Sequence, residues 1–216
     1  MTKAALEKPG RWTYADYRTW PEEERWELIG GEAYDMCPSP STTHQSVSFQ
    51  LGLVLGNFFR DRRCRVLAAP VDVLLPSSDE ADELVDTVVQ PDLLVICDRG
   101  KISERAVRGA PDLVVEILSP STAKKDEGVK RDRYEQAGVA EYWLVHPVDH
   151  TVFRYALMNG RYGRPEVFGA GDAMASTRFP GLLVVWDEVF ETGSSEDSSP
   201  EPDSRMTRSA TSRIGP

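Results

Sequence analysis

The chain lacks the features that mark several common classes of protein. It has no apolar run approaching the ~20 residues needed to cross a bilayer, and its first residues hold no apolar signal-peptide core. A Gly-rich phosphate loop, zinc-type Cys/His spacing, a Ser-His-Asp order and internal repeats are also missing. We therefore expect a cytoplasmic protein with no membrane partner, and the chemistry must come from other residues.

Cysteine is scarce as well. The three cysteines are Cys37, Cys64 and Cys97. Their number is odd and their spacing does not suit a metal site, so the sequence predicts reduced thiols rather than disulfides.

Length and composition indicate a single folded unit. A chain of 216 residues, 40% hydrophobic and 28% charged, is long enough for one domain with a good core and short for two. Residues 193–216 are rich in Ser, Pro, Glu, Asp, Thr and Arg and almost lack large apolar residues. We expect one domain over residues 1–192 and a disordered tail over residues 193–216.

The charge is acidic overall but uneven. A net charge of −10 argues against a protein that coats nucleic acid through its overall field. Five acidic residues and no basic ones lie between Ser77 and Asp86, whereas nine basic and six acidic residues lie between Arg99 and Arg133. The second segment remains compatible with a polyanionic substrate.

The pattern of apolar residues predicts an α/β (α+β) fold with a mixed central sheet flanked by helices. Residues 26–36 indicate a hairpin around Gly30-Gly31, and apolar positions recur at helical spacing from His44 to Phe59. The other expected elements are a short helix in residues 14–25, β-rich runs at 66–75 and 88–97, strands at 113–118 and 141–145, a helix from 121 or 122 to 137, and a C-terminal antiparallel extension at 151–157, 162–168 and 182–186.

Two Pro-Asp pairs within residues 88–141 are the most informative feature. Pro91-Asp92 and Pro111-Asp112 each open an apolar run, and the second run leads into Glu116. A carboxylate beside a buried strand is costly unless a cation or a proton compensates it. Asp92 and Glu116, 24 residues apart on expected neighbouring strands, therefore suggest a site for Mg²⁺ or Mn²⁺, with the carbonyl of Ile117 as a neutral ligand.

Further motifs occur together with the two Pro-Asp pairs. They are Trp26-Glu27-Leu28-Ile29-Gly30-Gly31-Glu32, the helix opening at His44, Val89-Gln90-Pro91-Asp92, the stretch from Gly109 to Thr122, Asp126, Lys130, Tyr134, and Gly138-Val139-Ala140-Glu141-Tyr142-Trp143. Together these motifs resemble the Uma-type restriction-endonuclease family of the PD-(D/E)XK nuclease superfamily. The resemblance covers roughly Tyr14 to Glu191 and implies a restriction-endonuclease-like core, divalent-metal dependence and a DNA substrate.

The chain departs from the superfamily's pattern at one position. The lysine that normally follows the acidic ligand by two residues is replaced by Leu118, and the resemblance makes Lys130 on the next helix the candidate. Asp126 and Lys130 are four residues apart, so the alternative is an ordinary surface salt bridge. The resemblance also suggests that Glu27 completes the metal shell from the hairpin and so assists catalysis; the alternative is a solvent-facing strand residue.

The remaining polar residues carry weaker expectations. His44, Lys124 and Lys125 are candidates for contacting the substrate, while Asp112 is expected to shape the start of its strand and Asp72 to lie behind the site. Three functions remain open: a metal-dependent endonuclease acting on DNA, a catalytically inactive nuclease-fold module that binds nucleic acid or protein, and a phosphoesterase for small phosphates. A homodimer formed through residues 151–186 is also compatible with the sequence.

Overall fold

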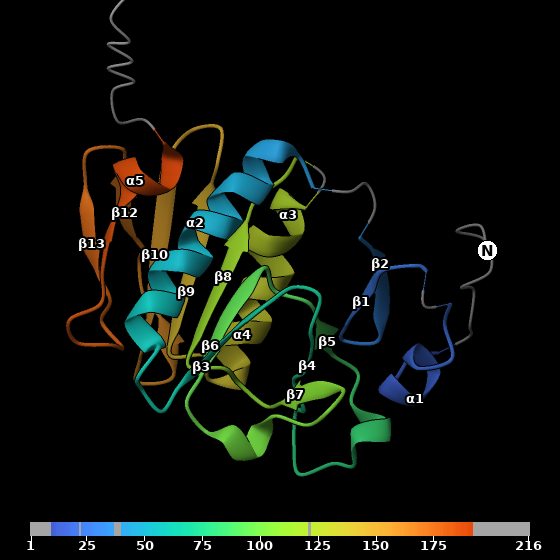
Figure 1. Cartoon of the computed structure of the whole chain (residues 1–216). Helices are drawn as coiled ribbons and strands as arrows, with labels where there is room; N and C mark the ends of the chain where they lie inside the picture. The colour runs from blue at the N-terminus through green and yellow to red at the C-terminus, as the bar shows by residue number, and fades with distance from the viewer. Residues whose placement is uncertain (1–9, 22, 37–39, 121, 192–216) are drawn as a thin grey trace, which may run out of the picture.

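The computed structural model describes residues 10–21, 23–36, 40–120 and 122–191. A seven-stranded sheet with strand order β11-β10-β9-β8-β6-β3 forms the centre, and β12 pairs with β10 (Figure 1). Its strands are β3 (Arg65–Ala68), β6 (Leu93–Ile96), β8 (Leu113–Ile117), β9 (Glu141–His146), β10 (Thr151–Met158), β11 (Arg161–Tyr162) and β12 (Glu166–Gly169). Strands β8 and β9 run parallel and the other pairs are antiparallel, so the predicted mixed sheet is confirmed.

One face of this sheet is covered by helix α2 (Thr42–Phe59). Its apolar residues repeat at helical spacing, and Val47, Leu51, Leu55 and Phe59 are buried against the sheet. The Ser41 hydroxyl caps the helix by accepting a hydrogen bond from the backbone N–H of His44. This cap fixes the helix start and so brings His44 to one end of the sheet.

The opposite face is covered by a composite helix and a second sheet. The helix consists of α3 (Ala123–Lys125), a π-helical turn (Asp126–Lys130) and α4 (Arg131–Ala137), and it connects β8 to β9. Gly138 ends it in the left-handed conformation, as its sequence predicted. The second sheet has the order β2-β1-β5-β4-β7 and consists of β1 (Trp26–Ile29), β2 (Glu32–Asp35), β4 (Asp72–Leu74), β5 (Val88–Val89) and β7 (Ala106–Arg108).

The C-terminal segment extends the fold beside α2 (Figure 1). It comprises the antiparallel pair β13 (Ala173–Ala175) and β14 (Leu183–Val185), followed by α5 (Trp186–Phe190). Glu141 in β9 is fully buried and anchors this segment: its carboxylate accepts hydrogen bonds from the Ser176 hydroxyl and the backbone N–H of Arg178. The indole N–H of Trp143 also donates to it.

Removing the charge of Glu141 is expected to destabilise the fold. Glu141→Gln leaves one oxygen in place of two, so at least one buried donor loses its acceptor, and we expect the free energy of unfolding to fall by about 1–3 kcal/mol. Glu166→Gln is the matched control, because Glu166 is 63% exposed and its ion pair with Arg154 contributes about 0–1 kcal/mol. Urea unfolding measures both variants, and equal loss in the two would contradict the anchoring role.

Three local expectations were wrong. Helix α1 covers only Tyr14–Tyr17, and Glu23 and Glu24 lie beyond its end. The β-rich runs at 66–75 and 88–97 are each divided between the two sheets, and each division contains a proline, Pro70 or Pro91, which has no N–H for a strand ladder. Trp186 begins α5 rather than ending a strand.

The prediction of reduced thiols was also wrong for two of the three cysteines. Cys64 and Cys97 form a disulfide. Their pairing follows from the register of β3 and β6, in which Arg65 lies opposite Ile96, so that the preceding and following residues also oppose each other. Cys37 and the expected tail at 193–216 lie outside the described residues. No described helix has the length and hydropathy to span a membrane.

Candidate active site

A cavity of about 320 Å³ opens at one end of the main sheet and is lined by residues from elements on both of its faces. The start of α2 contributes His44, the segment before β6 contributes Asp92, and the end of β8 contributes Glu116 and Ile117. The π-helical turn contributes Asp126 and Lys130 to the same wall. Residues predicted from four separate parts of the sequence thus line one cavity.

Asp92 and Glu116 meet through the pairing of β6 with β8. Leu93 lies opposite Val115 in this antiparallel pair, so the next position along each strand brings Asp92 opposite Glu116. The Oδ2 atom of Asp92 accepts a hydrogen bond of 2.7 Å from the backbone N–H of Ile117. The expectation that these carboxylates lie on neighbouring strands is therefore confirmed.

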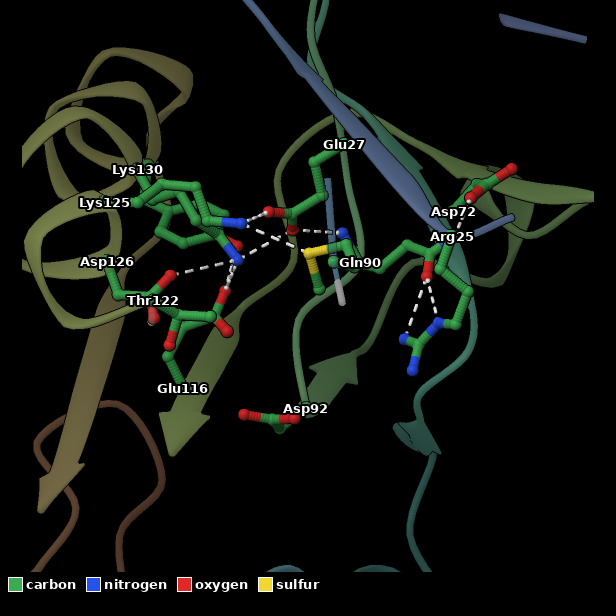
Figure 2. A network of polar contacts seen from close by, with 12 residues as sticks. Arg25, Glu27, Asp72, Gln90, Asp92, Glu116, Thr122, Lys125, Asp126 and Lys130 are labelled. Carbon is green, nitrogen blue, oxygen red and sulfur yellow. Dashed lines mark hydrogen bonds and ion pairs between the residues drawn. The ribbon is translucent and has the colours of Figure 1, made fainter. Parts of the chain in front are cut away.

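Lys130 lies among three carboxylates rather than on the surface. Its Nζ atom is 2.5 Å from Glu116 Oε1, 2.7 Å from Glu27 Oε1 and 3.5 Å from Asp126 Oδ1 (Figure 2). Its side chain is 1% exposed, which contradicts the alternative of an ordinary surface salt bridge with Asp126. Both residues belong to the π-helical turn, and such turns within α-helices occur frequently at functional sites.

Glu27 binds the lysines from the hairpin. It is fully buried; its Oε1 accepts hydrogen bonds from Lys130 and from the backbone N–H of Gln90, and its Oε2 accepts one of 2.5 Å from Lys125. Both oxygens are therefore already occupied by donors of the chain. Glu27 is not among the residues that line the cavity, so it contacts the lysines from behind.

His44 approaches Asp92 from the other face of the sheet. Its Nε2 atom is 3.3 Å from Asp92 Oδ2, and its side chain is 8% exposed. Burial opposes protonation, but the contact with Asp92 and the nearby carbonyl of Ile117 raise the pKa of His44. The protonated histidine would place a positive charge beside the Asp92 carboxylate.

The two other candidate substrate contacts differ in what the structure says of them. Lys125 lines the cavity with a 10% exposed side chain, although Glu27 and the sulfur of Met36 already accept hydrogen bonds from its ammonium. Lys124 belongs to α3, and its side chain lies outside the described part of the structure. Asp112 lies away from the cavity and accepts a hydrogen bond from the backbone N–H of Cys97, in accord with a role at the start of its strand.

Acidic and basic side chains are gathered at the site. Four acids (Asp92, Glu116, Asp126 and Glu27) lie with the ammonium groups of Lys125 and Lys130, the imidazole of His44 and the guanidinium of Arg25. Burial and then the neighbouring carboxylates raise the pKa of Glu116 well above its usual range, although Lys130 opposes this shift. The pKa of Lys130 is raised by the same carboxylates despite its burial, so its charge is retained. A divalent ion beside Glu116 would compensate the charge of its ionised form in place of a proton.

The donor set also fits Mg²⁺ or Mn²⁺. These ions are bound by oxygen atoms, and Mg²⁺ usually takes one or two carboxylates and keeps several waters. Asp92, Glu116 and the Ile117 carbonyl provide such a set at one side of the cavity. Within the described residues, no group of three or more Asp, Glu, His or Cys side chains is arranged to hold a metal ion without other ligands.

Comparisons with known proteins give the family and the fold of the chain. The family model Uma2, described as "Putative restriction endonuclease", matches residues 14–186. The chain belongs to the Uma2 family. A crystal structure of a putative nuclease belonging to DUF820 from Anabaena variabilis superposes with a TM-score of 0.67 at 21% identity, covering 83% of this chain and 97% of that one. This likeness shows the nuclease fold. A search of curated proteins gives no match.

Membership in Uma2 is consistent with the resemblance inferred from the sequence motifs. The sequence analysis gave no role to two residues that contact the site. Tyr134 donates a 2.6 Å hydrogen bond to Glu116 Oε1, and Gln90 donates its backbone N–H to Glu27. The sequence contains a signal for the first: Asp126, Lys130 and Tyr134 recur every four residues and so lie along one side of the helix. Gln90 has no comparable signal, because its role depends on the pairing of distant strands.

Proposed function

We propose that this Uma2 protein is a metal-dependent endonuclease of the PD-(D/E)XK type that hydrolyses phosphodiester bonds in DNA. The observation that supports it most strongly is the convergence of Asp92 and Glu116 on the cavity that also contains the ammonium of Lys130. Asp92, Glu116 and the Ile117 carbonyl would hold Mg²⁺ or Mn²⁺. Such an ion lowers the pKa of a bound water and stabilises the charge that develops on the phosphate.

Lys130 takes the role of the lysine that is missing from β8. Leu118 is 5% exposed and apolar, so the end of the strand supplies no cation. The π-helical turn brings Lys130 to Glu116 Oε1 instead, where its ammonium can orient a water or neutralise charge on the phosphate. This arrangement favours an active nuclease over the catalytically inactive alternative.

Glu27 is assigned to positioning Lys130 rather than to binding the ion. Both of its oxygens accept hydrogen bonds from groups of the chain. Although burial opposes ionisation, Lys130 and Lys125 hold the pKa of Glu27 below its usual value. The carboxylate therefore remains ionised and fixes the position of the Lys130 ammonium.

Removal of divalent ions is the direct test of this function. Purified protein incubated with supercoiled plasmid DNA is expected to give nicked and linear products in Mg²⁺ or Mn²⁺ and none in excess EDTA. Readdition of the ion after EDTA should restore cleavage, which separates ion dependence from irreversible unfolding. Cleavage that persists at the same rate in EDTA, or intact plasmid under all ion conditions, would contradict the proposal.

A further inference from the structure

One cation of the cavity wall has no acidic partner among the residues that the structure describes. Arg25 directly precedes β1 and lines the cavity, half-buried. Its Nη2 and Nε atoms donate hydrogen bonds of 3.0 and 3.3 Å to Gln90 Oε1, and no carboxylate in the described ranges forms an ion pair with it. Lys125 and Lys130, by contrast, both contact Glu27. A guanidinium remains charged at all relevant pH values, so Arg25 offers positive charge to an external anion.

Gln90 fixes the direction of this guanidinium. Its Nε2 atom donates to Asp72 Oδ1 (2.9 Å) and contacts the hydroxyl of Tyr17 (3.1 Å), which itself donates to Asp72. The Asp72 carboxylate only accepts hydrogen bonds and the Arg25 guanidinium only donates them. The amide of Gln90 must therefore direct its nitrogen to Asp72 and its oxygen to Arg25, so the orientation is chemically determined.

The same glutamine connects Arg25 to the catalytic candidates. The backbone N–H of Gln90 donates a 2.8 Å hydrogen bond to Glu27 Oε1, the atom that also binds Lys130. Figure 2 shows Arg25 and Lys130 on opposite sides of Gln90. Arg25 is thus held at a fixed place relative to Lys130, but separately from the carboxylates that would bind the ion.

We propose that Arg25 binds a backbone phosphate of DNA beside the phosphate that is cleaved, and that Gln90, supported by Asp72, positions it. This proposal rests on the proposed function for the identity of the substrate. Gln90 occupies only two of the five guanidinium N–H donors, and an arginine fork matches the oxygens of a phosphate. The contact is made to the sugar-phosphate backbone, so it contributes affinity without base preference.

The test measures DNA binding without cleavage. A fluorescein-labelled DNA duplex is titrated with protein in Ca²⁺, which takes the same oxygen ligands, and anisotropy is followed at several salt concentrations. Arg25→Ala is expected to weaken binding about tenfold and to lower the slope of log K against log salt by about 1, as loss of one phosphate contact requires. The matched control Arg60→Ala removes the same charge at the far end of α2, about 24 Å from His44.

The control is expected to bind with wild-type affinity and slope. Equal behaviour of Arg25→Ala and wild type overturns the proposal, as does an equal loss in both variants, which would show that only total charge matters. Absence of DNA binding by the wild type also overturns it. The proposed function fails separately, when the wild-type protein leaves plasmid DNA intact.

A second variant tests the positioning role of Gln90. Gln90→Met keeps the length of the side chain but removes its hydrogen bonds to Arg25. It should weaken DNA binding in the wild-type background and cause no additional loss in the Arg25→Ala background, because both changes remove the same contact. Additive losses in DNA affinity would contradict the coupling of the two residues. A general loss of stability in Gln90→Met would instead lower its Tm and leave the slope of log K against log salt unchanged.

Discussion

Asp92→Asn is expected to lower the rate of DNA cleavage by about 10³-fold or more, which corresponds to about 4 kcal/mol of lost transition-state stabilisation. Asparagine has nearly the same shape and retains an oxygen that can accept the hydrogen bond from the backbone N–H of Ile117. It lacks the negative charge that the ion requires. The fold should therefore persist while cleavage is lost, and a plasmid assay together with thermal unfolding measures both effects.

The second Pro-Asp pair supplies the control for this substitution. Asp112 follows Pro111 as Asp92 follows Pro91, and it accepts a hydrogen bond of 2.8 Å from the backbone N–H of Cys97. It also pairs with Arg178 and does not line the cavity. Asp112→Asn should leave cleavage within about twofold of wild type. If Asp92→Asn cleaves as well as Asp112→Asn, the carboxylate of Asp92 has only a structural role.

Lys130→Met is expected to slow cleavage strongly and to destabilise the protein. The substitution leaves Glu116 and Asp126 buried without the ammonium they contact, and leaves Glu27 with Lys125 alone, a loss that typically costs about 3–5 kcal/mol. Loss of a positioned cation at the phosphate should reduce the rate by about 10²–10³-fold. Single-turnover cleavage and urea unfolding, performed on the same preparation, measure the two effects.

A double variant separates the loss of stability from the loss of activity. Lys130→Met combined with Asp126→Asn removes one of the carboxylates that lost its cation, so the double variant should be more stable than Lys130→Met alone but equally inactive. Lys125→Met is the control, since Lys125 contacts Glu27 but not Glu116. Recovery of cleavage along with stability would show that Lys130 acts through the fold and not at the phosphate.

Local patterns predicted the elements that carry the site. The spacing of apolar residues gave α2 and β8, the two glycines gave the hairpin of β1 and β2, and Gly138 marked the end of α4. The run of apolar residues after each Pro-Asp pair also placed Asp92 and Glu116 beside neighbouring strands. These features depend on residues close together in the chain, and their physical signals are correspondingly strong.

Long-range pairing determined the features that the sequence did not predict. The disulfide of Cys64 and Cys97 depends on the register of β3 and β6, and the second sheet assembles strands from residues 26 to 108. Burial of Lys130 likewise requires Glu27 from a hairpin that is 103 residues away. A spacing of four residues indicates a helical ion pair equally well whether the pair is exposed or buried, so only the tertiary structure distinguishes them.

Titration of the protein with Mn²⁺ by isothermal calorimetry tests the central claim most directly. The claim is that Asp92 and Glu116 jointly hold one divalent ion beside Lys130. Wild type is expected to bind one Mn²⁺ per chain with release of protons, because the raised pKa of Glu116 makes the ion compete with a proton. Asp92→Asn and Glu116→Gln should each lose this binding. Stoichiometric Mn²⁺ binding of unchanged affinity in both variants would contradict the account.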